Sequence, residues 1–297
     1  MTRKSEFCYR VVDVFTQHPL EGNALAVFTD AVDLDPAMMQ RIARELNLVE
    51  TAFVFPPSRS DCIAQVRIFT PQKEMLFAGH PTIGTAFVLH DADVLPTNSD
   101  TFSLEERIGP VSVRVDRGDY PMFWLTTPAV EVGRTFDRPL CAAVLGLLES
   151  DLLDFPPLLL SAGNPTLFIP LRSKSAVDQA WLDVAGAKHL RGLDREPFCT
   201  LAFAPTEEGA YVRMFAPEYG VPEDPATGSA MGPLAEYMIR HGLISSRDGT
   251  RFVSEQGTRM GRRSLLHVRI NGEHGTLGIE VGGYVAPIAK GVMQLSL

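Results

Sequence analysis

Short apolar runs, many of them alternating with polar residues, dominate the chain and predict a protein rich in β-strands. The first, EFCYRVVDVF at residues 6–15, alternates as a half-buried strand does. Residues 102–128 predict two or three antiparallel strands joined by glycine-containing turns. Similar runs, several of them stopped by proline, predict strands at residues 50–57, 62–71, 165–171, 198–205, 210–217 and 265–270.

Three segments have helical character instead. In DLDPAMMQRIARELNL, residues 33–48, Asp35 can cap the helix and Pro36 suits its first turn. The apolar face of this helix would consist of Met39, Ile42, Ala43 and Leu46. A short buried helix rich in small residues is predicted over residues 82–92. A longer one is predicted over residues 230–243, with Pro233 in its first turns, where proline is tolerated.

Three short phrases occur twice in the chain, in the same order. GNALAVF at Gly22 pairs with GNPTLFI at Gly163, and RIFTP at Arg67 with RMFAP at Arg213. HPTIGTA, which begins at His80, then pairs with DPATGSA, which begins at Asp224. Three ordered matches predict an internal duplication. Two similar lobes would face each other and place equivalent loops on either side of one cleft.

Each repeated loop opens a helix, whose N-terminus offers unpaired N–H groups to an anion such as a carboxylate. Gly84, Gly228 and Ser229 would allow the backbone to approach a ligand closely. His80 and Asp224 hold matching positions and would form an acid/base pair. The first geometric prediction is therefore that His80, Asp224 and Glu50 line the same cleft.

A plainer interpretation exists for each of these three residues. His80 precedes a proline at a helix start and could be an ordinary loop or capping residue. Asp224 could be only a turn residue that caps a helix. Glu50 falls between a predicted helix and an apolar strand, so it is either a surface glutamate or a partly buried one with a raised pKa.

Composition and charge narrow the class of protein. A chain of 297 residues with 45% hydrophobic and 21% charged residues suits one large or two medium globular domains. No apolar run is long enough to span a membrane, and residues 1–15 lack a signal-peptide pattern, so a cytoplasmic protein is expected. The net charge of −9 argues against a nucleic-acid surface.

The four cysteines, Cys8, Cys62, Cys141 and Cys199, lie far apart and form no C-x-x-C motif. Neither a metal site nor a disulfide scaffold is indicated, and buried free thiols are expected. No phosphate-binding loop or dinucleotide fingerprint is present, so a nucleotide cofactor is not expected either.

Four stretches together resemble the PhzF-like family of phenazine-type biosynthesis: PLEGNALAVF, RIARELNLVETAFV, RIFTPQKEMLFAGHPTIGTA and YGVPEDPATGSAMGPLAEYMIRHG. The resemblance extends from Val12 to about Gly261. It implies an α+β, diaminopimelate-epimerase-like fold of two similar lobes related by a pseudo-two-fold axis. Each lobe would be a curved, barrel-like, mostly antiparallel sheet around a central helix. We expect residues 1–128, with 279–297 returning, in the N-terminal lobe and residues 129–278 in the C-terminal lobe.

The resemblance also implies an activity and roles for single residues. The family moves a proton on a small cyclic or unsaturated amino or hydroxy acid, typically as a homodimer and without a cofactor or metal. In the phenazine branch the substrate is trans-2,3-dihydro-3-hydroxyanthranilate. Glu50 matches the family's catalytic acid and base, and His80 and Asp224 match the polar residues that assist it. Gly79 matches the glycine before the histidine, while Gly228 and Ser229 match the carboxylate-binding pair.

Val49 stands where the family usually has serine before the glutamate, which makes the site more apolar or marks another substrate. Three alternatives therefore stay open: an isomerase of another secondary pathway, a racemase or epimerase of the same fold, and a non-catalytic protein that binds small acids. The racemases of this fold use two opposed cysteines. None of the four cysteines falls in either repeated loop, which argues against that chemistry.

Overall fold

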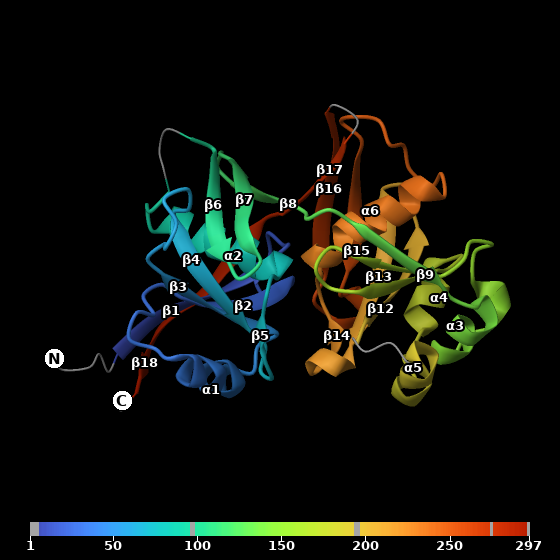
Figure 1. The fold of residues 1–297 in the computed structure, drawn as a ribbon, viewed down its shortest axis with the longest axis horizontal. Coiled ribbons are helices and arrows are strands. Elements are labelled where there is room, and N and C mark those ends of the chain that lie inside the picture. Colours follow the sequence, from blue (N-terminus) through green and yellow to red (C-terminus); the bar gives the residue numbers. More distant parts are fainter. Residues whose placement is uncertain (1–5, 96–98, 193–196, 274–275, 296–297) are drawn as a thin grey trace. The chain divides into compact units, whose positions relative to one another are not determined.

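The computed structural model describes residues 6–95, 99–192, 197–273 and 276–295. The chain forms two compact units (Figure 1). Unit 1 consists of Met1–Thr126 together with Gly282–Leu297, and unit 2 of Thr127–Val281. None of the described helices is both long and apolar enough to cross a membrane.

Unit 1 is built on a mostly antiparallel sheet. Its order runs β1, β2, β3, β4, β6, β7, β8, in which only the β2–β3 and β4–β6 pairs are parallel. β18 returns to pair with β1 along its whole length. The strands are β1 (Glu6–Val14), β2 (Asn23–Phe28), β3 (Glu50–Phe55), β4 (Ala64–Phe69), β5 (Glu74–Met75), β6 (Thr101–Glu106), β7 (Gly109–Asp116), β8 (Met122–Thr126) and β18 (Val285–Gln294).

Two helices complete unit 1. In α1 (Pro36–Leu46), the Asp35 side chain accepts a hydrogen bond from the Met38 N–H, which confirms the predicted cap. Met39, Ile42 and Ala43 are buried against a core rich in phenylalanine: Phe7, Phe28, Phe53 and Phe69. α2 (Gly79–Asp91) is buried along most of its length and packs on β1, β2, β3, β8 and β18. It is the central helix around which the sheet of unit 1 wraps.

Unit 2 repeats this order of strands. β10, β11, β12, β13, β15 and β16 pair in sequence, with only β11–β12 and β13–β15 parallel. The short β14 pairs with β13 as β5 pairs with β4. The strands are β9 (Glu131–Thr135), β10 (Leu158–Ser161), β11 (Thr166–Pro170), β12 (Cys199–Pro205), β13 (Gly209–Ala216), β14 (Val221–Asp224), β15 (Arg251–Gln256), β16 (Ser264–Glu273) and β17 (Thr276–Gly283).

α6 (Met231–Arg240) is the counterpart of α2 and begins after the single 3₁₀ turn η3 (Gly228–Ala230). It is buried over most of its length, and its Tyr237 ring packs on Phe168 and Phe203. The matching strand order and the matching central helices confirm the predicted duplication and the two-lobe fold.

Unit 2 also contains three short helices that the sequence analysis did not predict: α3 (Arg138–Val144), α4 (Lys174–Gln179) and α5 (Val184–Arg191). Each begins at a side-chain cap, supplied by Asp137, Ser173 and Asp183 respectively. Their apolar sides cover a second core that includes Leu167 and Ile169 of β11. Helices of six to eight residues gain little from propensity and form because tertiary packing stabilises them.

The cysteine prediction is only partly correct. All four cysteines are free, and Cys62, Cys141 and Cys199 are buried as expected. Cys8, however, is exposed on β1. The alternation of the strand explains this, because the neighbouring Phe7 points into the core and Cys8 must then point outward.

Candidate functional site

Glu50 and His80, far apart in the chain, meet in unit 1. Glu50 is the first residue of β3, and His80 is the second residue of α2. Nδ1 of His80 lies 3.2 Å from Oε2 of Glu50, with 4% and 12% of the two side chains exposed. Gly79 directly precedes His80, is the first residue of α2 and is also buried. The structure thus brings together the three residues predicted for this half of the site.

His80 is a neutral imidazole in the folded protein. Complete burial lowers its pKa to about 3, and a hydrogen bond with the backbone of Ala24 opposes this only in part. The contact with Glu50 is therefore a polar contact between a carboxyl group and a neutral ring, not an ion pair. Nδ2 of Asn23 also lies 3.2 Å from the same ring nitrogen. Which ring nitrogen holds the proton depends on the orientation of that amide.

Asn23 is a site residue that the sequence analysis did not select. It is the first residue of β2 and is fully buried. Its side chain contacts Nδ1 of the His80 ring. The sequence signal that points to Asn23 is the repeated Gly-Asn dipeptide, which also indicates the duplication.

Gly84 does not have the role that was predicted for it. A Cβ atom at this position would lie 2.5 Å from Cδ2 of Leu25 and 2.8 Å from Cγ2 of Val14. The glycine therefore allows α2 to pack closely on β1 and β2, inside the core. It serves helix packing and not the approach of a ligand.

In unit 2, Asp224 is the last residue of β14 and belongs to a closed hydrogen-bond network. Oδ2 of Asp224 accepts a 2.5 Å hydrogen bond from the Thr227 hydroxyl. The buried Gln256, at the end of β15, donates to the Asp224 carbonyl at 2.7 Å and accepts from the Thr227 N–H at 3.2 Å. These bonds fix both the backbone and the carboxylate of Asp224.

Gly228 and Ser229 lie in η3, directly before α6, and both are buried. The Ser229 hydroxyl accepts a hydrogen bond of 3.4 Å from Nδ2 of Asn164. Asn164 follows Gly163 just as Asn23 follows Gly22, so each unit uses its Gly-Asn dipeptide to contact a predicted site residue.

The two repeated Arg-x-Phe-x-Pro phrases have a common structural purpose. In unit 1, the Arg67 guanidinium makes two bonds of 2.7 and 2.8 Å to the carboxylate of Glu74, on β5. In unit 2, Arg213 makes two bonds of 2.8 Å to Glu223, on β14. β5 lies shortly before α2, which holds His80, and β14 ends at Asp224. These bidentate pairs therefore anchor both approaches to the candidate site residues.

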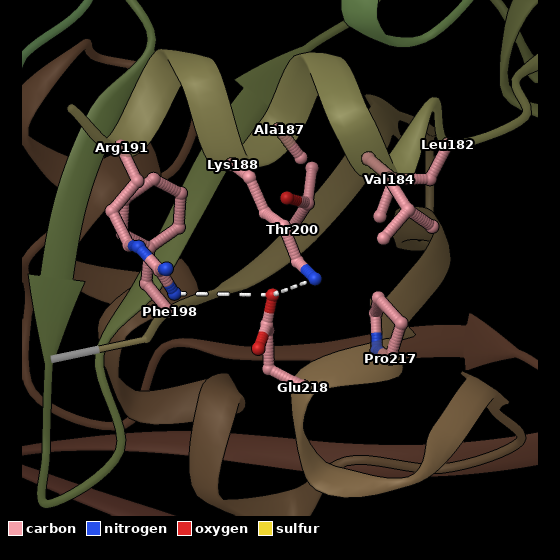
Figure 2. Close-up of a pocket in the computed structure, with 9 residues that line it drawn as sticks. All are labelled: Leu182, Val184, Ala187, Lys188, Arg191, Phe198, Thr200, Pro217 and Glu218. Carbon is pink, nitrogen blue, oxygen red and sulfur yellow. Dashed lines mark ion pairs between the residues drawn. The ribbon is translucent and has the colours of Figure 1, made fainter.

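A surface hollow in unit 2 lies apart from all of these residues (Figure 2). Glu218 is the one acidic residue that lines the hollow, and it lies 3.7 Å from Nζ of Lys188 and 3.9 Å from Arg191. The two cations that line the hollow are therefore already paired with a carboxylate. The hollow contains none of the predicted site residues, and we do not consider it the site. It is lined by Leu182, Val184, Ala187, Lys188, Arg191, Phe198, Thr200, Pro217 and Glu218.

The candidate residues carry groups that are able to transfer protons. Among the described residues, no cluster of three or more histidine, cysteine or acidic side chains is arranged to hold a metal ion. What the residues offer is one carboxyl group beside a neutral imidazole in unit 1. Unit 2 offers a fixed aspartate with a nearby serine. Such groups take and return protons or hold polar atoms of a small molecule.

The fold is that of the two-lobed, epimerase-like proteins. The chain belongs to the family described as phenazine biosynthesis-like protein, whose model matches residues 12–291. A trans-2,3-dihydro-3-hydroxyanthranilate isomerase from Pseudomonas aeruginosa is 37% identical over 286 residues, covering 95% of this chain and 98% of the relative. The enzyme class is therefore that of the isomerases.

Solved structures agree with this assignment. A predicted epimerase from Pseudomonas aeruginosa is 32% identical, with a TM-score of 0.82, over 98% of this chain and 99% of its own. A PhzF-family protein from Bacillus anthracis has a TM-score of 0.87 over 98% of this chain and all of its own, at 22% identity. At that identity the second likeness supports the fold alone.

Proposed function

We propose that this isomerase works without a cofactor and moves a proton on a small cyclic or unsaturated amino or hydroxy acid. The first candidate substrate is trans-2,3-dihydro-3-hydroxyanthranilate, in phenazine-type biosynthesis. This choice of substrate is supported by the trans-2,3-dihydro-3-hydroxyanthranilate isomerase of Pseudomonas aeruginosa, which aligns along nearly the whole chain.

The observation that carries the proposal is the 3.2 Å contact between the Glu50 carboxyl group and the neutral His80 ring. A carboxylate with little exposure to water is a stronger base than one in free solution. The neutral imidazole can donate or accept a hydrogen bond without fixing Glu50 in its charged form. Glu50 is therefore free to act first as general base and then as general acid.

In the proposed reaction, the Glu50 carboxylate removes the proton from C3 of the ring, and the electron pair of the broken C–H bond shifts the double bonds. The same carboxyl group returns a proton at C1, so that one C–H bond breaks and one forms. The C3 carbon carries the hydroxyl group, so the species formed is an enol, which tautomerises to a ketone. The reaction needs no oxidant or reductant, because the product is an isomer of the substrate.

The remaining predicted residues would hold the substrate. We propose that Gly79, His80 and Asp224 bind its polar groups, and that the backbone N–H groups of Gly228 and Ser229 contact its carboxylate. The burial of Ser229 and the fixed position of Asp224 support this, since both are preorganised and need no rearrangement. That these residues act on the same molecule as Glu50 stays a prediction. A crystal structure with 3-hydroxyanthranilate bound checks it.

The decisive experiment is Glu50→Gln, assayed by deuterium uptake from D₂O into the product. Glutamine has the same size but cannot accept a proton at neutral pH. We expect turnover to fall by at least about 10²- to 10⁴-fold, the usual contribution of a positioned acid–base group, with the fold and ligand binding retained. Glu45→Gln, on the exposed side of α1, is the matched control and keeps full activity.

Unchanged deuterium uptake in Glu50→Gln would contradict the mechanism, and His80 would become the candidate for the proton-carrying group.

A racemase or epimerase activity is the alternative favoured by the epimerase-like solved structure. It predicts deuterium exchange at the α-carbon of a chiral amino acid with loss of optical rotation. Tight binding of 3-hydroxyanthranilate with no exchange in any acid would instead indicate a binding protein. A homodimer is also proposed, and sedimentation velocity tests it.

A further inference from the structure

Two buried residues hold equivalent places at the ends of equivalent strands. Glu106 is the last residue of β6, and Gln256 is the last residue of β15. Both strands have six residues. Each runs parallel to its inner neighbour, β4 or β13, and antiparallel to the next strand, β7 or β16. The internal duplication has thus placed a carboxyl group in unit 1 where unit 2 has a carboxamide.

Gln256 shows what this position requires. Its side chain is fully buried, and its amide nitrogen donates to the Asp224 carbonyl. The same nitrogen lies 3.0 Å from the Thr227 hydroxyl, and its oxygen accepts from the Thr227 N–H. A neutral side chain with both a donor and an acceptor therefore holds the loop that leads to η3 and α6.

Glu106 likewise bonds to the start of the central helix of its own unit, although not at the positions that match the partners of Gln256. Only 5% of the residue is exposed, and its Oε1 lies 2.5 Å from the Thr82 hydroxyl. That hydroxyl also lies 2.8 Å from the Ala78 carbonyl oxygen, to which it can only donate. A hydroxyl has one hydrogen. If it is given to Ala78, the hydrogen of the short bond between Thr82 and Glu106 must come from Glu106.

The surroundings of Glu106 also favour its neutral form. Burial raises its pKa to about 8, against the smaller opposing effects of the bonds with Thr82 and the Ala78 backbone. The neighbouring acid on β6, Glu105, bonds to Ser58 instead, and Arg107 pairs with Glu74.

Among the described residues, the cations on the strands packed on α2 face away from Glu106: Arg10 of β1 pairs with Asp91, the last residue of α2, and Lys290 of β18 is exposed. The other titratable groups on these elements include the neutral His80, the Glu50 carboxyl that contacts it, and Asp13 of β1, which accepts from the Leu20 N–H. His90, in the last turn, packs its ring on Phe123. The pKa of Glu106 is shifted by burial and by its two hydrogen bonds, not by a charged neighbour.

We propose that Glu106 is a protonated positioning residue. Its carboxyl O–H donates to Thr82, which in turn donates to Ala78, and this chain holds the first turn of α2 and therefore Gly79 and His80 in place. Ionisation of Glu106 at alkaline pH breaks the chain and lowers activity. The effect on activity rests on the proposed function of His80, whereas the protonation of Glu106 does not.

The protonation is tested by comparing wild type with Glu106→Gln, which mimics Gln256. A folded-state pKa above the unfolded value means that the stabilising effect is complete below about pH 4.5 and is lost as pH rises toward about 8. We expect the melting temperature of Glu106→Gln to rise relative to wild type across that window and to run parallel above it. Parallel curves throughout would overturn the protonation, because Glu106 would then be ionised in the fold.

Infrared difference spectroscopy gives a second, independent readout at about pH 6. The wild-type spectrum minus that of Glu106→Gln should contain the C=O band of one protonated carboxyl group. Glu105→Gln is the matched control, because the hydrogen bond with Ser58 outweighs the effect of burial and lowers the pKa of Glu105. It should remove no such band. A missing band in the Glu106 difference overturns the proposal even if the variant's stability is altered for other reasons.

The positioning role is tested by the pH profile of kcat/KM. Wild type should lose activity above about pH 8, while Glu106→Gln should keep its activity at about pH 9. The kcat/KM of Glu106→Leu should be about tenfold or more below that of wild type at every pH. Gln256→Glu should create a new alkaline loss. Identical alkaline limbs in wild type and Glu106→Gln would overturn the positioning role. If Glu50→Gln retains turnover, the proposed function fails, yet the infrared result still decides the state of Glu106.

Discussion

Asn23 and Asn164 illustrate, at the scale of residues, how one dipeptide serves two different partners. Asn23 contacts an imidazole in unit 1, and Asn164 contacts a hydroxyl in unit 2. The backbone turn is the same in both cases, because each asparagine follows a glycine with positive φ, Gly22 and Gly163. The duplication has therefore conserved the geometry while the chemistry of the contacted residue has diverged.

Replacing Asn23 by alanine should weaken catalysis, because the His80 ring loses one of its polar contacts. Losing a buried hydrogen-bond partner costs about 1–3 kcal/mol, so we expect kcat/KM to fall about 10- to 100-fold. Steady-state kinetics measures the loss, and the nitrogen NMR shifts of His80 report the change in its surroundings. Asn164→Ala is the matched change in unit 2 and should leave those shifts unaltered. An unaltered His80 spectrum in Asn23→Ala would contradict the contact.

Local patterns in the sequence singled out some candidate residues and could not single out others. The Gly-His and Asp-Pro phrases singled out His80 and Asp224 because motif and repeat coincided there. Glu106 was hidden, because in the stretch FSLEER it is one of two adjacent acids that look equally exposed. Only the pleat of β6 separates them, with Glu105 toward Ser58 and Glu106 toward Thr82.

At the scale of elements, capping residues were the most reliable signal when a clear apolar face accompanied them. α1 has both and begins at Pro36 after the Asp35 cap, as predicted. α3, α4 and α5 have caps but only six to eight residues each, too few for a helical period to stand out. Their place over the core of β11 depends on contacts between distant segments, which no local pattern contains.

The close packing of α2 predicts that Gly84→Ala destabilises the protein. Alanine favours a helix by about 1 kcal/mol, but here its Cβ would overlap Leu25 and Val14. Overpacking of this kind costs about 1–3 kcal/mol, so the net result should be a loss of stability. Urea unfolding measures it. Gly118→Ala, where a Cβ meets nothing within 4 Å, should change stability by less than about 0.5 kcal/mol.

At the scale of the whole molecule, unit 1 is assembled from two separate stretches of the chain. β18, which follows unit 2 in sequence, pairs with every residue of β1 from Glu6 to Val14. Only the family resemblance predicted that residues near the C-terminus return to the first lobe. No local signal could give it, because the pattern of β18 says nothing of its partner.

Removing residues 285–297 should therefore unfold unit 1 selectively. β1 would lose one of its two neighbouring strands, and α2 would lose part of the wall that covers it. We expect amides of β1, β2 and α2 to lose hydrogen-exchange protection, while those of β12, β13 and α6 stay protected. Mass spectrometry of exchanged peptides measures both sets in one sample. Equal protection of β1 in the shortened and full-length chains would show that β18 is dispensable.

The pairing of β1 with β18 also sets the order of events during synthesis on the ribosome. All of unit 2 emerges before β18 does, so its sheet can close while the nascent unit 1 still exposes an unpaired edge of β1. Such an edge is a template for association with other chains. Until translation ends, the half of the protein that carries Glu50 and His80 is the half that most needs protection from aggregation.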